Sequence, residues 1–163
     1  MAHPRLGPPP AALCHATIIL KGYGVVLYRR SPWYETAPVP ASDQPWFVNG
    51  VAAVETALGP EALLAVLHRV EAELGRSRSV PNAARIIDLD LLAYGRIITG
   101  GGVAEQREGR LVLPHPRMHE RRFVLQPLVD LAPAWRHPVI GRTARELLQD
   151  LPAEPPVRRL NSN

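Results

Sequence analysis

Cysteine and long apolar runs are scarce in this chain of 163 residues. Cys14 is the only cysteine, so no disulfide can form within the chain, and a reducing compartment such as the cytoplasm is expected. No apolar run approaches the roughly 20 residues that a membrane-spanning helix needs. The apolar stretch at residues 16–20 ends at Lys21 and Gly22. Neither a membrane span nor a secretory signal is therefore predicted.

Lysine is nearly absent as well, because Lys21 is the only lysine among 19 basic residues. The other basic residues are arginines, and the formal net charge is +4. A guanidinium group binds phosphate oxygens in a bidentate manner, so this composition suits a small phosphorylated ligand as well as a polynucleotide. The motifs G-x-x-x-x-G-K-[ST] and G-x-G-x-x-G do not occur, which excludes a P-loop and a dinucleotide-binding fingerprint.

The length and the hydrophobic share of 46% fit one globular domain over residues 1–163, with loose ends expected at residues 1–10 and 156–163. Apolar spacing, glycines and prolines predict helices at residues 11–20, 60–74, 119–125 and 144–151, the third of them limited by Pro127. Apolar and β-branched runs predict strands at residues 25–28, 46–57 and 86–94. This order of elements indicates an α+β sandwich with a mostly antiparallel sheet.

Asp88 and Asp90 are two residues apart within a predicted strand. Side chains at positions i and i+2 of a strand point to the same face, so the two carboxylates are expected to lie side by side. Adjacent anions need a cation, and Mg²⁺ commonly combines one or two carboxylates with substrate phosphates. The alternative is a pair of solvated carboxylates on an edge strand.

Two basic segments flank the acidic pair: Arg76, Arg78 and Arg85 precede it, and Arg110, His115, Arg117 and Arg121 follow it. Carboxylates beside many guanidinium groups indicate a site for a metal triphosphate, because in phosphoryl-type transfer the protein mainly aligns oxygens and neutralises charge. Any single arginine could equally be a solvated surface residue. The histidines do not have the spacing of a zinc site.

A second candidate group lies in the segment YETAPVPASDQPWFVN at residues 34–49. Its prolines stiffen a loop that is expected to place Thr36 and Val39 near Trp46, Phe47 and the amide of Asn49. Such a set can hold a flat heterocycle, because an asparagine amide offers both donors and an acceptor to the edge of a ring. The alternative is a core asparagine beside packed aromatic rings. Phe123, which lies in a predicted helix, has the same alternative of a core position.

Taken together, these segments resemble the hydroxymethyldihydropterin pyrophosphokinases over residues 31–151. The resemblance rests on four ordered motifs, namely W-Y-E-T-A-P-V with Q-P-W-F-V-N, V-E-A-E-L-G-R-S-R, R-I-I-D-L-D-L-L-A-Y-G, and R-L-V-L-P-H-P-R-M-H-E-R-R-F-V-L-Q-P-L. It implies a ferredoxin-like α+β fold, ATP as co-substrate with two Mg²⁺ ions, and the formation of AMP and a pterin diphosphate in folate biosynthesis. We further expect a cytoplasmic monomer whose partners are its small-molecule substrates, with neither nucleic acid nor membrane.

The resemblance also assigns residues to the site. Asp88 and Asp90 match the metal-binding pair, and a catalytic role falls on them together with Arg76 and Arg85. The nucleotide side comprises Glu71, Arg76, Arg85, Leu91, Arg110, Leu111, His115 and Arg121. The pterin side comprises Thr36, Val39, Phe47, Asn49 and Phe123. In the usual mechanism of this family, the substrate hydroxyl attacks the β-phosphorus of ATP.

The sequence departs from the family pattern in two places. The family opens with an apolar strand that runs into a Gly-Ser-Asn or Gly-Ala-Asn turn, and this first strand is missing here. The loop at residues 77–84 is shorter than the common pattern and has no tryptophan. The missing strand leaves three alternatives: a start that lies upstream, another segment that fills the gap, or a degenerate member that binds ATP or pterin without turnover. A nucleic-acid-binding domain is a further rival, which the acidic pair within the basic cluster disfavours.

Overall fold

The computed structural model of the chain describes residues 9–37, 46–75, 87–100 and 110–160. These residues form helices and antiparallel strands, so the predicted α+β class is confirmed. The chain folds as two compact units: unit 1 comprises Met1–Leu27 and Val54–Leu91, and unit 2 comprises Tyr28–Ala53 and Leu92–Asn163. In the described part of the chain, no helix is long and apolar enough to cross a membrane.

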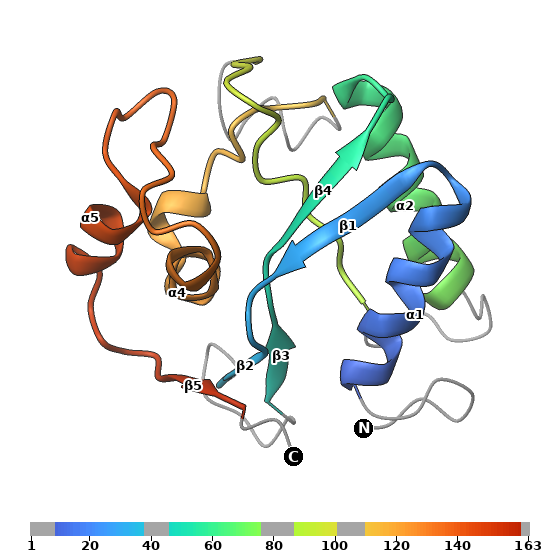
Figure 1. The fold of residues 1–163 in the computed structure, drawn as a ribbon. Helices are drawn as coiled ribbons and strands as arrows, with labels where there is room; N and C mark the ends of the chain where they lie inside the picture. The colour runs from blue at the N-terminus through green and yellow to red at the C-terminus, as the bar shows by residue number, and fades with distance from the viewer. Residues whose placement is uncertain (1–8, 38–45, 76–86, 101–109, 161–163) are drawn as a thin grey trace. The chain divides into compact units, whose positions relative to one another are not determined.

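Two helices that contact each other build unit 1 (Figure 1). Helix α1 spans Pro9–Gly22 and α2 spans Pro60–Gly75, and both were predicted from sequence. Proline is tolerated at the start of each because the first helical N–H groups have no partner within the helix. The core-facing side chains recur every three or four residues, as a buried helix face requires: Ala12, Ala16 and Leu20 on α1, and Leu63, Leu67, Val70 and Leu74 on α2. Cys14 lies on the exposed side of α1.

Strands β1, Val25–Arg30, and β4, Ala52–Thr56, form a two-stranded sheet. They run in opposite directions (Figure 1). The strand expected at residues 25–28 is therefore present and extends to Arg30. Val25 is buried in unit 1, whereas Val26 and Tyr28 are exposed, which is the alternation of a strand with one covered face.

Unit 2 contains a three-stranded antiparallel sheet in the order β3-β2-β5. Its strands are β2, Tyr34–Thr36, β3, Phe47–Asn49, and β5, Val157–Arg159. Helix α4, Arg122–Leu131, contacts all three strands and also α5, Ala144–Gln149. The expectation of a loose end beyond residue 155 is therefore wrong for β5, whose pairing with β2 orders this part of the chain.

The core of unit 2 lies between α4, α5 and the short 3-10 helix η1, Met118–Glu120. Its buried members are Met118, Val124, Leu125, Leu128, Ala144 and Leu147. Helix α5 begins at a capping box in which Thr143 and Glu146 satisfy each other's backbone N–H groups. The helix predicted at residues 144–151 is therefore observed. All three tryptophans of the chain, Trp33, Trp46 and Trp135, belong to unit 2.

The prediction of one continuous strand at residues 46–57 is wrong, because β3 and β4 belong to different sheets. The interruption lies at Gly50 and Val51. A Cβ atom at position 50 would lie 2.6 Å from two ring atoms of Trp33, so only glycine lets the chain pass the indole. The Val51 N–H donates to Oγ of Ser31 at 3.0 Å, and the Ser31 N–H donates to the Val51 carbonyl at 2.8 Å.

The strand predicted at residues 86–94 is also wrong for its described part, because residues 87–94 pair with no other described part of the chain as a strand. Residue 86 lies outside the described residues. An apolar, alternating run becomes a strand only when a neighbouring strand pairs with its backbone groups. Here the Leu89 N–H donates to the side chain of Glu71, and the Leu92 carbonyl accepts from the His115 N–H.

The helix expected at residues 119–125 is observed in part, because residues 122–125 belong to α4, but its start at His119 and its limit at Pro127 are wrong. His119 lies in η1, and α4 begins only at Arg122 and continues through Pro127 to Leu131. Proline inside a helix removes one backbone hydrogen bond. Pro127 is itself fully buried, and the apolar face on either side of it is buried too. Burial of this face outweighs the local preference of proline.

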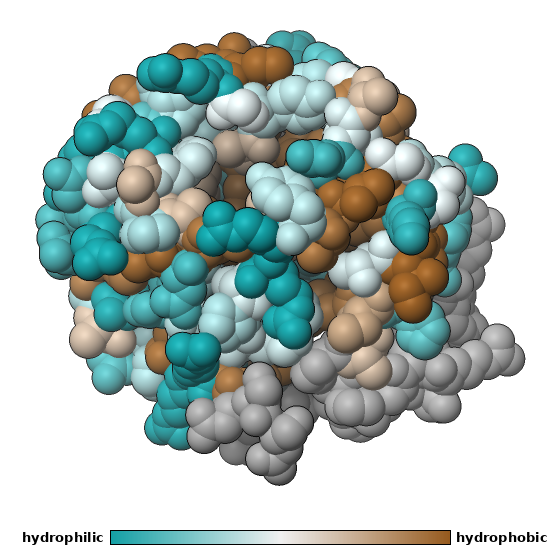
Figure 2. All heavy atoms as spheres, in the orientation of Figure 1, coloured by the Kyte–Doolittle hydropathy of each residue, from teal (hydrophilic) through white to brown (hydrophobic). Residues whose placement is uncertain are grey.

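Hydrophobic side chains also remain on the surface. On the face drawn in Figure 2, hydrophobic residues form separate patches among hydrophilic ones. The large exposed apolar side chains include Ile18, Val26, Phe47, Ile98 and Val139. They come from different elements, and scattered exposed apolar residues are normal on a folded domain.

Candidate active site

The acidic segment, which we define as residues 87–91 of unit 1, carries the two predicted metal ligands. Ile87 is buried, Leu89 and Leu91 are half-buried, and Asp88 and Asp90 are exposed. The period of two that was expected of a strand is thus kept without a ladder. Both carboxylates are presented on the solvent-exposed side of the segment.

Glu71, predicted at the nucleotide side, lies on α2 of unit 1. One of its carboxylate oxygens accepts a hydrogen bond of 2.5 Å from the backbone N–H of Leu89, the residue between the two aspartates. The acidic segment is therefore attached to α2 by a side chain. Hydrogen bonds from an N–H group to a carboxylate are shorter and stronger than those between neutral groups.

The amide pair, which we define as Thr36 and Asn49, lies in unit 2. Residues on β2 and β3 are in antiparallel register, with Tyr34 opposite Asn49 and Thr36 opposite Phe47. Within this register, the Asn49 side-chain amide donates to Oγ1 of Thr36 at 2.8 Å. Thr36 is buried, Asn49 is half-buried and Phe47 is 53% exposed. The structure thus brings three of the predicted heterocycle-binding residues to the paired strands β2 and β3.

Phe123 and Arg121, both predicted site residues of unit 2, lie next to each other. The Arg121 guanidinium lies over the Phe123 ring, 5.7 Å from its centre. Phe123 also packs against the buried cluster of unit 2. Its role as a core residue, which the sequence left open, is therefore real, and its partial exposure leaves one part of the ring at the surface.

His115, predicted at the ATP phosphates, is 4% exposed. Its backbone N–H donates to the Leu92 carbonyl at 2.8 Å. Its Nδ1 accepts from the Arg117 N–H at 3.2 Å, so a neutral His115 carries its proton on Nε2. Nearby in sequence, Arg110 is exposed, and the Leu111 carbonyl accepts from Oγ1 of Thr99.

Three predicted site residues, Val39, Arg76 and Arg85, lie outside the described residues. Among the residues that are described, no group of three or more His, Cys, Asp or Glu could hold a metal ion. Mg²⁺ does not need such a cage, because it is usually bound by one or two carboxylates together with substrate phosphates and water. The exposed oxygens of Asp88 and Asp90 fit that pattern.

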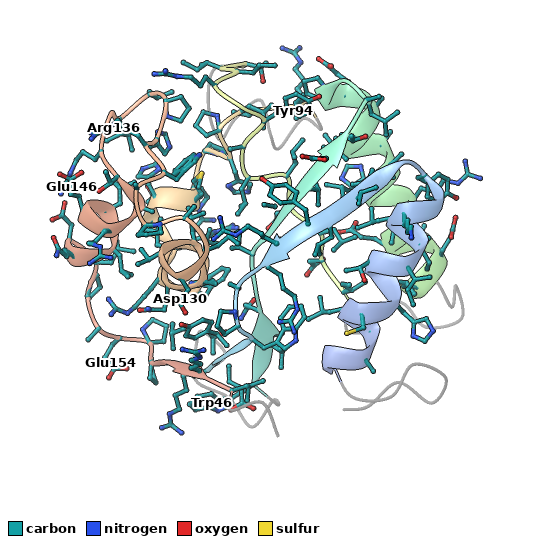
Figure 3. All side chains as sticks on the ribbon, in the orientation of Figure 1. Trp46, Tyr94, Asp130, Arg136, Glu146 and Glu154 are labelled. Carbon is teal, nitrogen blue, oxygen red and sulfur yellow. The ribbon has the colours of Figure 1, made fainter. Side chains whose placement is uncertain are left out.

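Tyr34 and Asp130 form a contact in unit 2 that the sequence did not reveal. The Tyr34 hydroxyl, on β2, donates to a carboxylate oxygen of Asp130 at 2.5 Å, and Asp130 lies on α4 (Figure 3). Burial and this hydrogen bond raise the pKa of Tyr34 to about 12. The two residues are 96 positions apart, so no spacing motif could have indicated the contact. It holds the strand of Thr36 against α4.

His119 and His137 form a second unforeseen pair in unit 2. Their rings meet edge to face, with centres 5.7 Å apart. The Nδ1 atom of His137 accepts from the N–H groups of Val139 and Ile140. Burial, and secondarily the proximity of His119, lower the pKa of His137. None of the sequence motifs pointed to His137.

The comparisons with known proteins agree with the motifs. A sequence profile of the family described as 7,8-dihydro-6-hydroxymethylpterin-pyrophosphokinase matches residues 5–133. A 2-amino-4-hydroxy-6-hydroxymethyldihydropteridine pyrophosphokinase of Pseudomonas aeruginosa is 44% identical over 124 residues, which cover 76% of this chain and 72% of that protein. The protein of the same name from Methylorubrum extorquens is 42% identical over 128 residues, covering 78% of this chain and 75% of that protein.

Longer relatives match over a small part of their length. The folic acid synthesis protein fol1 of Pneumocystis carinii is 42% identical over 118 residues, which cover 72% of this chain and 15% of that protein. A mitochondrial folate synthesis bifunctional protein of Arabidopsis thaliana is 42% identical over 113 residues, covering 69% of this chain and 19% of that protein. The profile match and the bacterial relatives together decide the assignment: the chain belongs to the 7,8-dihydro-6-hydroxymethylpterin-pyrophosphokinase family.

Proposed function

We propose that this chain transfers the pyrophosphoryl group of ATP to 6-hydroxymethyl-7,8-dihydropterin and releases AMP and the pterin diphosphate, a step of folate biosynthesis. The observation that carries the proposal is the family match over residues 5–133, which includes the acidic segment and the amide pair. The names of the bacterial relatives describe the same activity for those proteins. The exposed carboxylates of Asp88 and Asp90 supply the acidic ligands that such a transfer needs.

The pterin side of the site is proposed to be Thr36, Val39, Phe47, Asn49 and Phe123. The Asn49 amide uses one N–H group to reach Thr36, and this bond fixes the plane of the amide. Its other N–H and its carbonyl oxygen then offer a donor and an acceptor in one plane, which suits the edge of a pterin ring. The exposed ring of Phe47 supplies a flat apolar surface for the same ligand.

The nucleotide side is proposed to be Glu71, Arg76, Arg85, Leu91, Arg110, Leu111, His115 and Arg121. The cationic members bind phosphate oxygens and spread the negative charge that moves during transfer. Asp88 and Asp90 would hold two Mg²⁺ ions, which neutralise charge on the phosphates when bound. The pterin hydroxyl oxygen forms a bond to the β-phosphorus, the bond from that phosphorus to the oxygen shared with the α-phosphate breaks, and the hydroxyl proton leaves to solvent.

The proposal also covers the fold, the oligomeric state and the cellular location of the chain. We infer a ferredoxin-like sandwich as a single domain over residues 1–163 that acts as a monomer. The antiparallel strands of unit 2 with α4 packed on them support the sandwich. The single cysteine supports a cytoplasmic location. The proposed partners are the two small-molecule substrates alone.

The test is the formation of AMP by the purified chain. The chain is incubated with ATP, Mg²⁺ and 6-hydroxymethyl-7,8-dihydropterin, and AMP is separated by chromatography. We expect AMP in amounts that depend on the pterin, and none above background from a variant with both Asp88→Ala and Asp90→Ala. A folded chain that binds ATP or pterin and releases no AMP would instead be the degenerate binding protein. Release of AMP without pterin would also contradict the proposal.

A further inference from the structure

The hydrogen bond between Glu71 and Leu89 joins the proposed catalytic aspartates to a helix that carries no other site residue. Glu71 lies four residues after the buried Leu67 and next to the buried Val70, so its side chain leaves α2 beside the core of unit 1. Its carboxylate is half-buried and accepts from the Leu89 N–H at 2.5 Å. A partly buried carboxylate keeps its hydrogen bond to a backbone amide, because loss of this bond would leave a partly desolvated charge without a donor.

The backbone N–H of Leu89 has no sheet partner. Among the described residues, 87–94 pair with no strand, so no ladder of the described sheets fixes the acidic segment. The Glu71 carboxylate therefore occupies the place that a strand carbonyl would take. In unit 1, this contact ties the middle of the segment to α2.

The position of this contact determines what it does to the aspartates. Leu89 lies between Asp88 and Asp90, and the exposure pattern alternates, with Leu89 half-buried and both aspartates exposed. In an extended chain, fixing the direction of one residue's peptide fixes the side to which its two neighbours point. Holding the Leu89 amide against α2 thus keeps both carboxylates on the exposed side.

We propose that Glu71 is a positioning residue that holds Asp88 and Asp90 in register for the metal-bound nucleotide by accepting the Leu89 N–H, without touching the nucleotide itself. The inference rests on the proposed function, because it gives the aspartates a ligand to hold. Within the nucleotide side of the site, it gives Glu71 a part that works through the aspartates rather than by direct contact with the nucleotide. An acceptor oxygen at this position is what the role requires, whereas a negative charge is not.

The chain offers a matched control on the same helix. Glu73 lies two residues further along α2 and is also a carboxylate with a short hydrogen bond, which it accepts from the Tyr23 hydroxyl at 2.5 Å. It also pairs with Arg69 at 3.5 Å, and its side chain is 41% exposed. Substitution of Glu73 removes one charge from the same region of α2 without removing the contact to the acidic segment.

The experiment compares Glu71→Ala, Glu71→Gln and Glu73→Ala in the full chain. Binding of Mn²⁺, used as a paramagnetic substitute for Mg²⁺, is measured by electron paramagnetic resonance in the presence of a non-hydrolysable ATP analogue. The Mg²⁺ concentration that gives half-maximal AMP formation and the KM for the pterin are measured in parallel. Circular dichroism checks that each variant is folded. If Glu71→Ala does not fold, Glu71→Met replaces it, since methionine keeps the length of the side chain and lacks the acceptor oxygen.

We call Glu71→Ala, or Glu71→Met where it is used instead, the acceptor-free variant. We expect it to bind Mn²⁺ about 10- to 100-fold more weakly than the unchanged chain, the range typical for loss of a group that orients a metal ligand. Glu71→Gln keeps an acceptor oxygen and should stay within about threefold of the unchanged chain, as should Glu73→Ala, and the KM for the pterin should not change in any of them. Unchanged Mn²⁺ binding by the acceptor-free variant overturns the inference. Equal weakening by Glu71→Gln also overturns it, because the charge and not the acceptor would then matter.

The proposed activity and this inference fail in different ways. If the unchanged chain makes no AMP, the activity is contradicted, and the comparison of Mn²⁺ binding among the variants still decides the role of Glu71. If the unchanged chain makes AMP and the variants do not differ in Mn²⁺ binding, the activity stands and the inference is wrong. An unchanged chain that binds no Mn²⁺ with the nucleotide analogue contradicts both.

Discussion

The amide pair of unit 2 and the acidic segment of unit 1 are positioned by different kinds of contact. Thr36 lies on β2, the central strand of a three-stranded sheet, and Asn49 lies on the neighbouring strand β3. The acidic segment has no ladder and is attached to α2 by the hydrogen bond from Leu89 to Glu71. In the first case a sheet ladder takes part in the positioning, whereas in the second the hydrogen bond described here comes from a side chain on a helix.

This difference teaches where the site tolerates change. A sheet whose strands are joined by several backbone hydrogen bonds keeps its register when one side-chain contact is lost. A segment outside the described sheets moves more easily when a side-chain contact such as the Glu71 hydrogen bond is removed, because local openings are easiest where backbone hydrogen bonds are few. We therefore expect substitutions around the acidic segment to reduce turnover strongly, and those around the amide pair to act mainly on binding of the heterocycle.

The largest effect is expected from Asp88→Asn, which removes one carboxylate charge of the acidic segment. AMP formation should fall about 10²- to 10³-fold, because a neutral amide binds Mg²⁺ less well than a carboxylate does, and the metal is what neutralises the charge of the phosphates. The rate is measured at saturating ATP and pterin. Asp150→Asn, on the exposed end of α5, is the control and should stay within about twofold. An equal loss of AMP formation in Asp88→Asn and Asp150→Asn would contradict a specific role of the acidic segment in turnover.

A smaller effect is expected at the amide pair. Asn49→Ala should raise the KM for the pterin about 10- to 100-fold, which corresponds to the loss of one or two hydrogen bonds worth about 1–3 kcal/mol in total. Thr36→Val removes only the acceptor of the Asn49 amide, so its KM should rise about threefold, because β2 and β3 keep Asn49 in place. Steady-state kinetics with the pterin as varied substrate measure both. If Thr36→Val is as damaging as Asn49→Ala, the ladder does not provide the expected support.

The attachment of β2 to α4 depends in part on the Tyr34 hydroxyl. Tyr34→Phe removes the hydroxyl that donates to Asp130 and should lower the free energy of unfolding by about 1 kcal/mol at pH 8. The pKa of Tyr34 is raised to about 12 in the folded chain, above its value near 10 in the unfolded chain. The unfolded chain therefore loses this proton first, and the contribution is full below pH 10 and fades as the pH rises towards 12. Urea unfolding at pH 8 and pH 10.5, followed by circular dichroism, checks this.

The Tyr34→Phe variant should thus unfold more easily than the unchanged chain at pH 8. The difference between their free energies of unfolding should narrow at pH 10.5. A gap that grows with pH would have the wrong sign for a raised pKa. The effect on the KM for the pterin should remain small, because β3 and β5 still pair with β2.

How far sequence reasoning reached can be judged from particular residues. Helices α1 and α2 could be predicted because their buried side chains recur with helical spacing and glycines follow them. The break at Gly50 could not, because it depends on the Trp33 ring, which lies 17 positions away in sequence and meets the chain only after folding. The continuation of α4 through Pro127 was missed for the same reason, since its stability comes from packing.

The candidate site divides in a similar way. The closeness of Thr36 and Asn49 followed from one short segment, and the structure gives them a direct hydrogen bond. The partner of Glu71 could not be foreseen, because a strand was expected where residues 87–94 have no ladder. Period-two alternation still put Asp88 and Asp90 on one side, so the chemical reading of the aspartates did not depend on the strand.

The smallest effect is expected from a residue outside both site regions. Burial and His119 lower the pKa of His137 in the folded chain, so below pH 6.5 the unfolded chain binds more protons than the folded chain at this residue. The free energy of unfolding should therefore fall as the pH is lowered from 7.5 to 5.5, by less than about 1.4 kcal/mol per pH unit, the limit for one proton. In His137→Asn, which keeps an acceptor near Nδ1, the slope should be smaller. An unchanged slope, measured by urea unfolding across this range, would contradict the assignment.

The placement of Cys14 and of the tryptophans has a practical consequence. Cys14 is exposed on α1 in unit 1 and is the only thiol of the chain, whereas all three indoles belong to unit 2. A thiol-reactive dye therefore labels the protein at one site without any substitution. Intrinsic emission then follows unit 2, the dye follows unit 1, and a single sample can tell whether substrate addition or denaturant affects the two units in one event or in two.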